Sequence, residues 1–308
     1  MGILKNKHNK FRAGWQILLI LVILNLFLFI ISFVEGIIIF ALNIDSINGS
    51  QEMMAETFNQ LLNSFNMPLL LGQEIITIAV CIFCWKLIIK QPLKNMGLKS
   101  IRKHSKELLC GLGLGALSIT IVFIFIVATG NAKVTSWTLS FSLDTFLYLI
   151  LYIFVGFAEE ILGRGYIISV MKQTRNIPLM VGVSAVIFSL MHIFNSSFSL
   201  IAFINIALVG VVFALMYIWS GNLWMCIGYH ITWNYFQGNV FGFPVSGMDS
   251  KGIISTIYNE NNIINGGGFG PEGGLAVTAI LIAGLLFVRW YYKGKVSIFL
   301  KEENGIII

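Results

Sequence analysis

Charged side chains are scarce in this sequence: Lys, Arg, Asp and Glu make up only 11% of its 308 residues, whereas 57% are hydrophobic. A soluble globular protein carries about 25% charged residues, which cover its surface. The scarcity therefore excludes a soluble single domain, a disordered chain, a coiled coil and a nucleic-acid-binding protein, since each needs far more polar surface. With a mean hydropathy of +0.85, the chain is expected to be surrounded mostly by lipid.

Cysteine is also rare, and all four copies lie in or beside apolar runs, namely Cys81, Cys84, Cys110 and Cys226. Cys81 and Cys84 form a single C-x-x-C on an expected helix, with no second pair elsewhere. A zinc or redox motif of this type needs a second pair or a neighbouring strand pattern. We therefore interpret these cysteines as small packing residues.

Long apolar runs are what the sequence has in abundance. A spanning helix needs about 20 mostly apolar residues to cross about 30 Å of hydrocarbon. Eight runs approach this length, at residues 15–42, 68–89, 108–129, 145–169, 178–194, 200–219, 223–241 and 275–292. We predict an all-α polytopic membrane protein of about eight transmembrane helices, with residues 1–308 forming one integral membrane domain.

The positions of Lys and Arg predict the orientation, because short cytoplasmic loops carry an excess of them. With the N-terminus inside and eight spans, 17 of the 20 Lys and Arg residues fall on the cytoplasmic side, only Lys133 and Lys251 fall outside, and Arg164 lies within a span. Both termini are therefore expected to be cytoplasmic. Two long outer segments follow from this topology, at 43–67 and 242–274, and the second ends in the glycine-rich NGGGFGPEGG, which opposes helix formation.

Ionisable residues at membrane depth are costly, by about 2.5–3.5 kcal/mol each, and so indicate a function. The fourth run contains Glu159, Glu160 and Arg164. Glu160 and Arg164 are four residues apart and can pair on one helix face. Glu159 remains as a second acid without a base, which a purely structural ion pair between helices would not need. Gly156 and Gly163 share its face, and their missing side chains leave space for another chain or a substrate.

Two further runs carry the only intramembrane histidines. His192 follows Phe188 by one helical turn, and Asn234 follows His230 by one turn. At about 1.5 Å of rise per residue, Glu159, His192 and Asn234 each lie about 20 Å from the inner face, and His230 about 14 Å. These side chains are therefore expected at similar depths in the membrane.

Three motifs in this order, E-E-x-x-x-R, F-x-x-x-H and H-x-x-x-N, resemble the CAAX prenyl protease and bacteriocin-processing (CPBP, or Abi) family of intramembrane glutamic proteases. The likeness covers residues 145–241, and the FGPEGG segment resembles the tail of bacterial members. The resemblance implies helices around an intramembrane catalytic cavity and endopeptidase activity on a membrane-associated peptide or protein.

The resemblance also implies roles for the motif residues. Glu159 would activate water with help from His192, while His230 and Asn234 would stabilise the oxyanion, and Glu160 and Arg164 would orient the site. These groups supply what peptide hydrolysis requires: a base, a proton donor and oxyanion donors. No cofactor is expected. Besides lipid, the expected partner is a peptide or membrane-protein substrate, with no nucleic acid, and the oligomeric state stays open.

Two alternatives remain at this point. Glu159, His192 and His230 also form a two-His, one-Glu set of the kind that binds catalytic zinc, although H-E-x-x-H is absent. The second alternative is a protein without catalytic activity: an immunity factor, a scaffold, or a proton-coupled transporter with these residues as a relay. A transporter would be expected to show repeated halves, which the sequence lacks.

Overall fold

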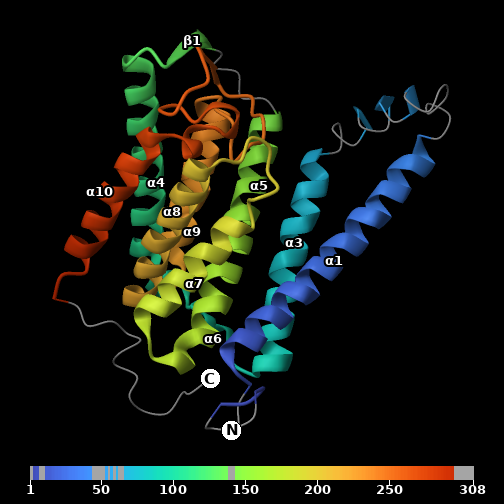
Figure 1. The fold of residues 1–308 in the computed structure, drawn as a ribbon, viewed down its shortest axis with the longest axis vertical. Coiled ribbons are helices and arrows are strands. Elements are labelled where there is room, and N and C mark those ends of the chain that lie inside the picture. The colour runs from blue at the N-terminus through green and yellow to red at the C-terminus, as the bar shows by residue number, and fades with distance from the viewer. Residues whose placement is uncertain are drawn as a thin grey trace.

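The computed structural model describes residues 3–6, 11–43, 53–54, 56–57, 60–61, 66–137 and 143–294. Most of the predicted outer segment 43–67, and the basic residues Lys7, Lys10, Lys295 and Lys301, lie outside the described part. The described residues are mainly helical, which confirms the predicted all-α class (Figure 1). Their eight helices of 12 or more residues are α1 (Ala13–Leu42), α3 (Asn66–Cys84), α4 (Ser105–Ala128), α5 (Leu143–Glu160), α7 (Ile177–Leu190), α8 (Leu200–Ser220), α9 (Trp224–Tyr235) and α10 (Leu275–Tyr291).

Most of these helices are long and apolar enough for a membrane. Five helical stretches can span it by length and composition, at Ala13–Leu42, Met67–Ile89, Ser105–Ala128, Thr145–Thr174 and Leu200–Ser220, and Ile177–Leu190 and Leu275–Tyr291 are shorter apolar helices. Large hydrophobic side chains point outward from them; on α1, Phe29 is 70% exposed and Phe33 61% exposed. Such a surface is stable only in lipid, so the protein is a multi-pass membrane protein.

Three helices continue as π-helix, at η2 (Trp85–Ile89) after α3, η5 (Ile161–Ile168) after α5 and η7 (Phe236–Val240) after α9. Such π segments often occur at functional sites. Short elements at the same end of the molecule as the start of α1 are η3 (Leu93–Met96), η4 (Ile101–Lys103), α6 (Ser169–Met171) and η6 (Lys172–Thr174).

Helices α4 and α9 pack backbone against backbone. A Cβ on Gly111 or Gly115 of α4 would overlap the carbonyl oxygen of Met225 or Tyr229, respectively. The hydroxyl of Thr232 also donates to the carbonyl of Leu112 at 2.8 Å. Small residues permit this close approach in membranes, where lipid is as apolar as the helix surface. The contact holds α9, which carries His230 and Asn234, in a set position.

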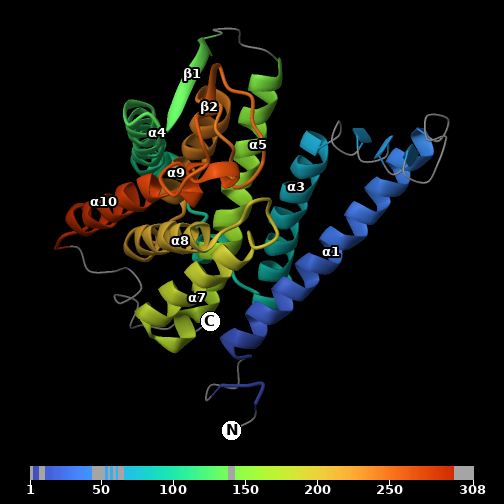
Figure 2. The ribbon, with the colours of Figure 1, turned by 45° about the horizontal axis from the view of Figure 1, so that its top comes forward.

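In contrast, α1 is only loosely attached to the rest of the bundle. It contacts α3 and α6, but it tilts away from α3 toward the end of the molecule that carries the strands (Figure 2). The large cluster of buried hydrophobic side chains is formed mainly by the other helices, and α1 contributes only Ala13, Ile17, Ile20 and Leu24 to it.

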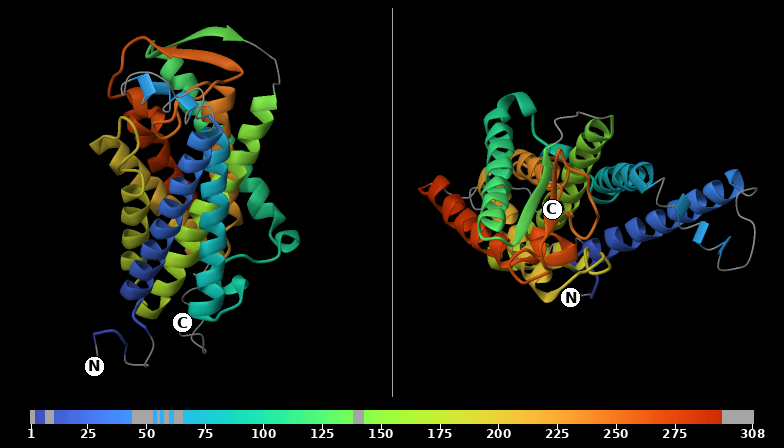
Figure 3. Two further views of the ribbon diagram at one scale, coloured as in Figure 1. Left: turned by 90° about the vertical axis from the view of Figure 1, so that its right-hand side faces the viewer. Right: turned by 90° about the horizontal axis from the view of Figure 1, so that it is seen from above.

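A small antiparallel sheet joins two loops that the sequence predicts to lie on the outer side. Strand β1 (Ala132–Trp137) pairs with β2 (Ile254–Tyr258), and the register is irregular between Val134 and Ser136. The sheet was not predicted from the sequence. It lies at the end opposite the start of α1 (Figure 3), as expected if both loops are on one side of the membrane.

The glycine-rich segment forms two single 3₁₀ turns, η8 (Gly267–Phe269) and η9 (Pro271–Gly273). Gly270 has φ +92°, and a Cβ there would overlap the carbonyl oxygen of Pro244. This position requires glycine both for its backbone conformation and for the close approach. The segment folds back over the ends of α8 and α9 and brings Glu272 into the interior, as described below.

One predicted boundary is wrong in a way that affects the site. The fifth apolar run, 178–194, was expected to be helical to its end, but α7 ends at Leu190. His192 therefore lies in a turn beyond the helix. The hydrophobic pattern continues past Leu190, but the backbone leaves the helix there, and Asn195 and Ser196 further along the turn contact the loop at Ser246 and Gly247.

Candidate active site

Glu160 and Arg164 form a buried ion pair at the junction of α5 and η5. Nη1 of Arg164 donates to Oε1 of Glu160 at 2.9 Å, and neither side chain is exposed. The predicted pairing of these two residues therefore occurs, although the turn that separates them begins a π-helix rather than continuing the α-helix. The wider turn is stabilised from α7, where the Ser184 hydroxyl donates to the carbonyl of Gly163 at 2.8 Å.

Two aromatic rings contact the guanidinium of Arg164. Its central carbon lies 4.0 Å from the ring centroid of Phe188 and 5.1 Å from that of Phe213. Cations over aromatic faces are stabilised by the ring quadrupole, more strongly where water is absent. Phe188 is the first residue of the F-x-x-x-H motif, so its contact with Arg164 explains why that position is aromatic.

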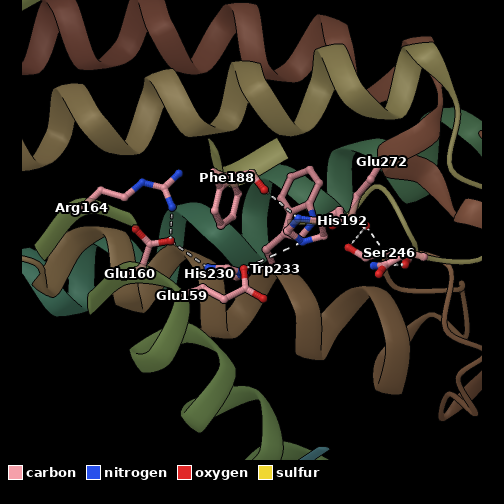
Figure 4. A network of polar contacts seen from close by, with 10 residues as sticks. Glu159, Glu160, Arg164, Phe188, His192, His230, Trp233, Ser246 and Glu272 are labelled. Atoms are coloured by element: carbon pink, nitrogen blue, oxygen red, sulfur yellow. Dashed lines mark hydrogen bonds and ion pairs between the residues drawn. The ribbon is translucent and has the colours of Figure 1, made fainter. Parts of the chain in front are cut away.

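His230 bridges the two adjacent carboxylates. Its Nδ1 lies 3.0 Å from Oε1 of Glu160, and its Nε2 lies 3.7 Å from Oε2 of Glu159. A carboxylate that is already paired with Arg164 accepts hydrogen bonds, so Nδ1 of His230 carries a proton and donates it to Glu160. This bond orients the ring and leaves Nε2 facing Glu159 (Figure 4).

His192 reaches the same carboxylate from the turn that follows α7. Its Nδ1 lies 2.9 Å from the carbonyl oxygen of Phe188, while its own amide donates to Ser189. Because a carbonyl can only accept, the ring donates from Nδ1, and Nε2 is the nitrogen that lies 4.0 Å from Oε2 of Glu159. The F-x-x-x-H spacing thus lets the ring bind the carbonyl four residues earlier at the end of α7.

Three groups from separate elements therefore converge on one point. Glu159 Oε2 makes no direct hydrogen bond to the described residues and faces Nε2 of both histidines. A water molecule can hydrogen-bond to two atoms at once, each about 2.8 Å from its oxygen. With an angle of about 90° between the two bonds, the bonded atoms are about 4 Å apart, which matches the distances from Glu159 Oε2 to the two histidine nitrogens. The arrangement can accordingly hold a water between Glu159, His192 and His230.

The same spacing is wider than that between the ligands of a bound zinc ion. Tetrahedral zinc ligands at about 2.0–2.1 Å from the ion lie about 3.3 Å apart, closer than either histidine nitrogen lies to Glu159. In the part of the chain that the structure describes, no group of three or more His, Cys, Asp and Glu side chains is arranged to hold a metal ion. The described side chains therefore do not form a preformed tetrahedral zinc site, and the chelation experiment given below separates the glutamic mechanism from the zinc-dependent one.

Asn234 lies in the same cavity as the two histidines. The cavity has apolar walls from α8, α9 and α10, and the polar residues that line it are His192, Asn205, His230, Asn234, Ser246 and Glu272. Asn234 is 5% exposed, one turn beyond His230 on α9. Gly156, expected to leave room for another chain, packs instead against Ile231 of α9. The space that this glycine provides is therefore filled by the helix that carries His230.

Two acids near the site are not among the residues predicted from the sequence. Glu272, in η9, lines the cavity through a loop contact that no spacing rule could indicate. Glu74, in α3, interacts electrostatically with both Glu159 and His230. Its position inside the second apolar run was a usable signal, because it is another ionisable residue at membrane depth.

Comparison with known proteins identifies the segment that carries these motifs. Residues 140–236 match the family model described as type II CAAX prenyl endopeptidase Rce1-like. The matched range holds all of α5, η5, α6, η6, α7, α8 and α9, together with all six predicted site residues. No curated protein and no solved structure matches the chain.

Proposed function

We propose that the protein is an intramembrane endopeptidase of the glutamic type, because residues 140–236 match the model of the type II CAAX prenyl endopeptidase Rce1-like family. Its substrate is a membrane-associated peptide or protein, and its reaction is hydrolysis of a peptide bond. The observation that carries the proposal is the convergence of Glu159 Oε2 with Nε2 of His192 and His230, at 4.0 and 3.7 Å, inside a helical bundle.

In the first step, Glu159 acts as the general base. It removes a proton from the water held between it and the two histidines while the water oxygen attacks the carbonyl carbon of the scissile bond. The carbonyl π electrons move to its oxygen, and a tetrahedral oxyanion forms. The water-sized spacing around Glu159 supports this step, because base and nucleophile are then in contact before the reaction starts.

Donors on α9 stabilise the oxyanion. In its doubly protonated form, His230 donates from Nδ1 to Glu160 and from Nε2 toward the reaction centre, and Asn234 lines the same cavity one turn away. Preorganised donors at a developing negative charge typically provide the largest single contribution to catalysis. Collapse of the intermediate then transfers the proton from Glu159, directly or through Nε2 of His192, to the leaving nitrogen, and the carbon–nitrogen bond breaks.

Glu160 and Arg164 are positioning residues. Glu160 orients His230 through a hydrogen bond. Arg164 neutralises Glu160 in an ion pair, and the rings of Phe188 and Phe213 hold its guanidinium in place. Without Arg164, two adjacent carboxylates would face a single histidine. The ion pair thus leaves Glu159 as the carboxylate available for water.

The proposal is tested by reconstituting the full-length protein in liposomes with a mixed-sequence synthetic peptide library and detecting cleaved bonds by mass spectrometry. Wild-type protein should generate new peptide termini, and Glu159→Gln should generate none while keeping the wild-type unfolding temperature in detergent. Glu260→Gln is the matched control, since Glu260 is an exposed acid in an outer loop.

Two results would contradict the proposal. Cleavage by Glu159→Gln at the wild-type rate would remove the proposed base. Activity that is lost on exhaustive chelation and regained with stoichiometric zinc would favour the metal-dependent alternative. A cellular phenotype of the protein that Glu159→Gln leaves intact would instead indicate a scaffold or immunity role. We also propose a cell-membrane location with both termini in the cytoplasm, supported by the distribution of Lys and Arg.

A further inference from the structure

Glu272 is held by three donors at the outer end of the catalytic cavity. Its Oε2 accepts from the backbone amide of Ser246 at 2.7 Å and from the Ser246 hydroxyl at 2.8 Å. Its Oε1 accepts a longer bond of 3.3 Å from the indole nitrogen of Trp233. Figure 4 shows this group beside His192, and the same residues line the cavity together with His230.

The backbone around Glu272 is also anchored. Asn205 of α8 donates to the carbonyl oxygens of Glu272 and Gly274 at 2.8 and 2.9 Å, and accepts from the hydroxyl of Thr278 at 2.7 Å. Asn195, three residues after His192, donates to the carbonyl of Ser246 at 2.8 Å. The carboxylate thus has a set position relative to the catalytic histidines.

Among the described residues, no ion pair compensates a negative charge on Glu272. All three of its donors are neutral. An ionised carboxylate has about four acceptor sites. Oε2 already has two good donors, whereas Oε1 has one long contact and can accept another. In a cavity with apolar walls, a negatively charged Glu272 carboxylate with an unused acceptor site attracts a positively charged partner.

We propose that Glu272 is a specificity-determining residue that binds a positively charged group of the substrate, either a Lys or Arg side chain or an α-ammonium, at one position relative to the cleaved bond. This inference rests on the proposed protease function. It implies that a substrate whose free C-terminal carboxylate would lie at that position is disfavoured, because two carboxylates would then meet in a poorly solvated space.

The test is the cleavage profile of the full-length protein in liposomes with the mixed-sequence peptide library. Wild type should favour Lys and Arg at one position by about ten- to hundredfold over Gln, the range for a hydrogen bond between charged groups. Glu272→Gln should abolish this preference while still cleaving peptides with a neutral residue there. Glu260→Gln should retain the wild-type profile.

A purely structural role for Glu272 gives different results. Ser246→Ala removes one of the hydrogen bonds to Glu272 but keeps the charge, so it should keep the basic preference even if overall activity falls. Equal losses for all peptides in Glu272→Gln and Ser246→Ala, or a wild-type profile without a basic preference at any position, would overturn the inference and leave the protease proposal standing. If wild type cleaves nothing, the proposed function itself fails, and this inference with it.

Discussion

Glu160 accepts a hydrogen bond of 3.0 Å from Nδ1 of His230, a residue 70 positions further along the chain. This bond connects the first motif to the third and decides which nitrogen of His230 faces Glu159. It gives the pair of adjacent acids two distinct environments: Glu160 is paired with Arg164 and His230, and Glu159 is available for water. The following predictions test this division of roles.

The two histidines should differ in what their removal does to the fold. His192→Ala and His230→Ala are both expected to abolish peptide cleavage, but only His230→Ala should clearly destabilise the protein. It removes a donor from the fully buried Glu160, at a cost of about 1–3 kcal/mol. Cleavage assays and thermal unfolding in detergent measure the two effects. Full activity of either variant would refute its assigned role, and His104→Gln, a histidine outside the cavity, is the control.

Breaking the buried ion pair should mainly damage stability. Glu160→Gln or Arg164→Ala leaves an unpaired buried charge, which costs about 3–5 kcal/mol. The double variant Glu160→Gln with Arg164→Met should recover part of that loss, since it removes both charges, but should remain inactive because His230 is no longer held by a carboxylate. Denaturant titration of the three variants measures this, and unchanged stability of Glu160→Gln would contradict it.

Asn234→Ala should lower kcat by about 10²–10³, the loss expected for one oxyanion donor. The unfolding temperature should stay near the wild-type value, because the carboxamide makes no hydrogen bond to other described residues and only lines the cavity. Asn234→Asp has the same size but lacks the N–H donors, so its kcat should fall similarly. A kcat within twofold of wild type for either variant would exclude Asn234 from the oxyanion site.

The glycines of α4 offer a matched pair for testing the helix contact behind the site. A Cβ at Gly115 would overlap the backbone of α9 at Tyr229, whereas a Cβ at Gly113 meets nothing within 4 Å. Gly115→Ala should therefore lower stability by about 1–3 kcal/mol through overpacking and reduce activity by displacing His230. Gly113→Ala should be tolerated in both assays. Equal behaviour of the two variants would show that the α4–α9 contact does not position the site.

The proposed topology can be checked by cysteine labelling. In a background with the native cysteines replaced, a cysteine at Lys133 in β1 should react with a membrane-impermeant maleimide in intact cells. A cysteine at Lys94 in η3 should react only after permeabilisation. The expected contrast follows from the excess of Lys and Arg on the inner side. The opposite labelling pattern would invert the orientation, and labelling of both sites in intact cells would contradict the span count.

The sequence was sufficient for the helical membrane class because the length and apolarity of a span are local properties. It was also sufficient to single out Glu159, Glu160, Arg164, His192 and His230, since an ionisable residue in an apolar run is conspicuous wherever the run lies in the fold. The same rule applied to Glu74 would have found it. The end of α7 before His192 could not be predicted, because the apolar pattern continues past the point where the backbone turns.

Which of these side chains meet was decided only by the tertiary structure. Sequence spacing relates residues on one helix, such as Glu160 and Arg164, but contacts between α5, α9 and the turn after α7 depend on how closely the helices pack. That packing is set by glycines that meet a neighbouring backbone and by the η5 turn. Glu272 enters the cavity through a loop that folds back over the bundle, and its partners Ser246 and Trp233 are 26 and 39 residues away. Hydrophobic periodicity relates residues within one helix and not across such a loop. The contacts of Glu272 could therefore be found only in the tertiary structure.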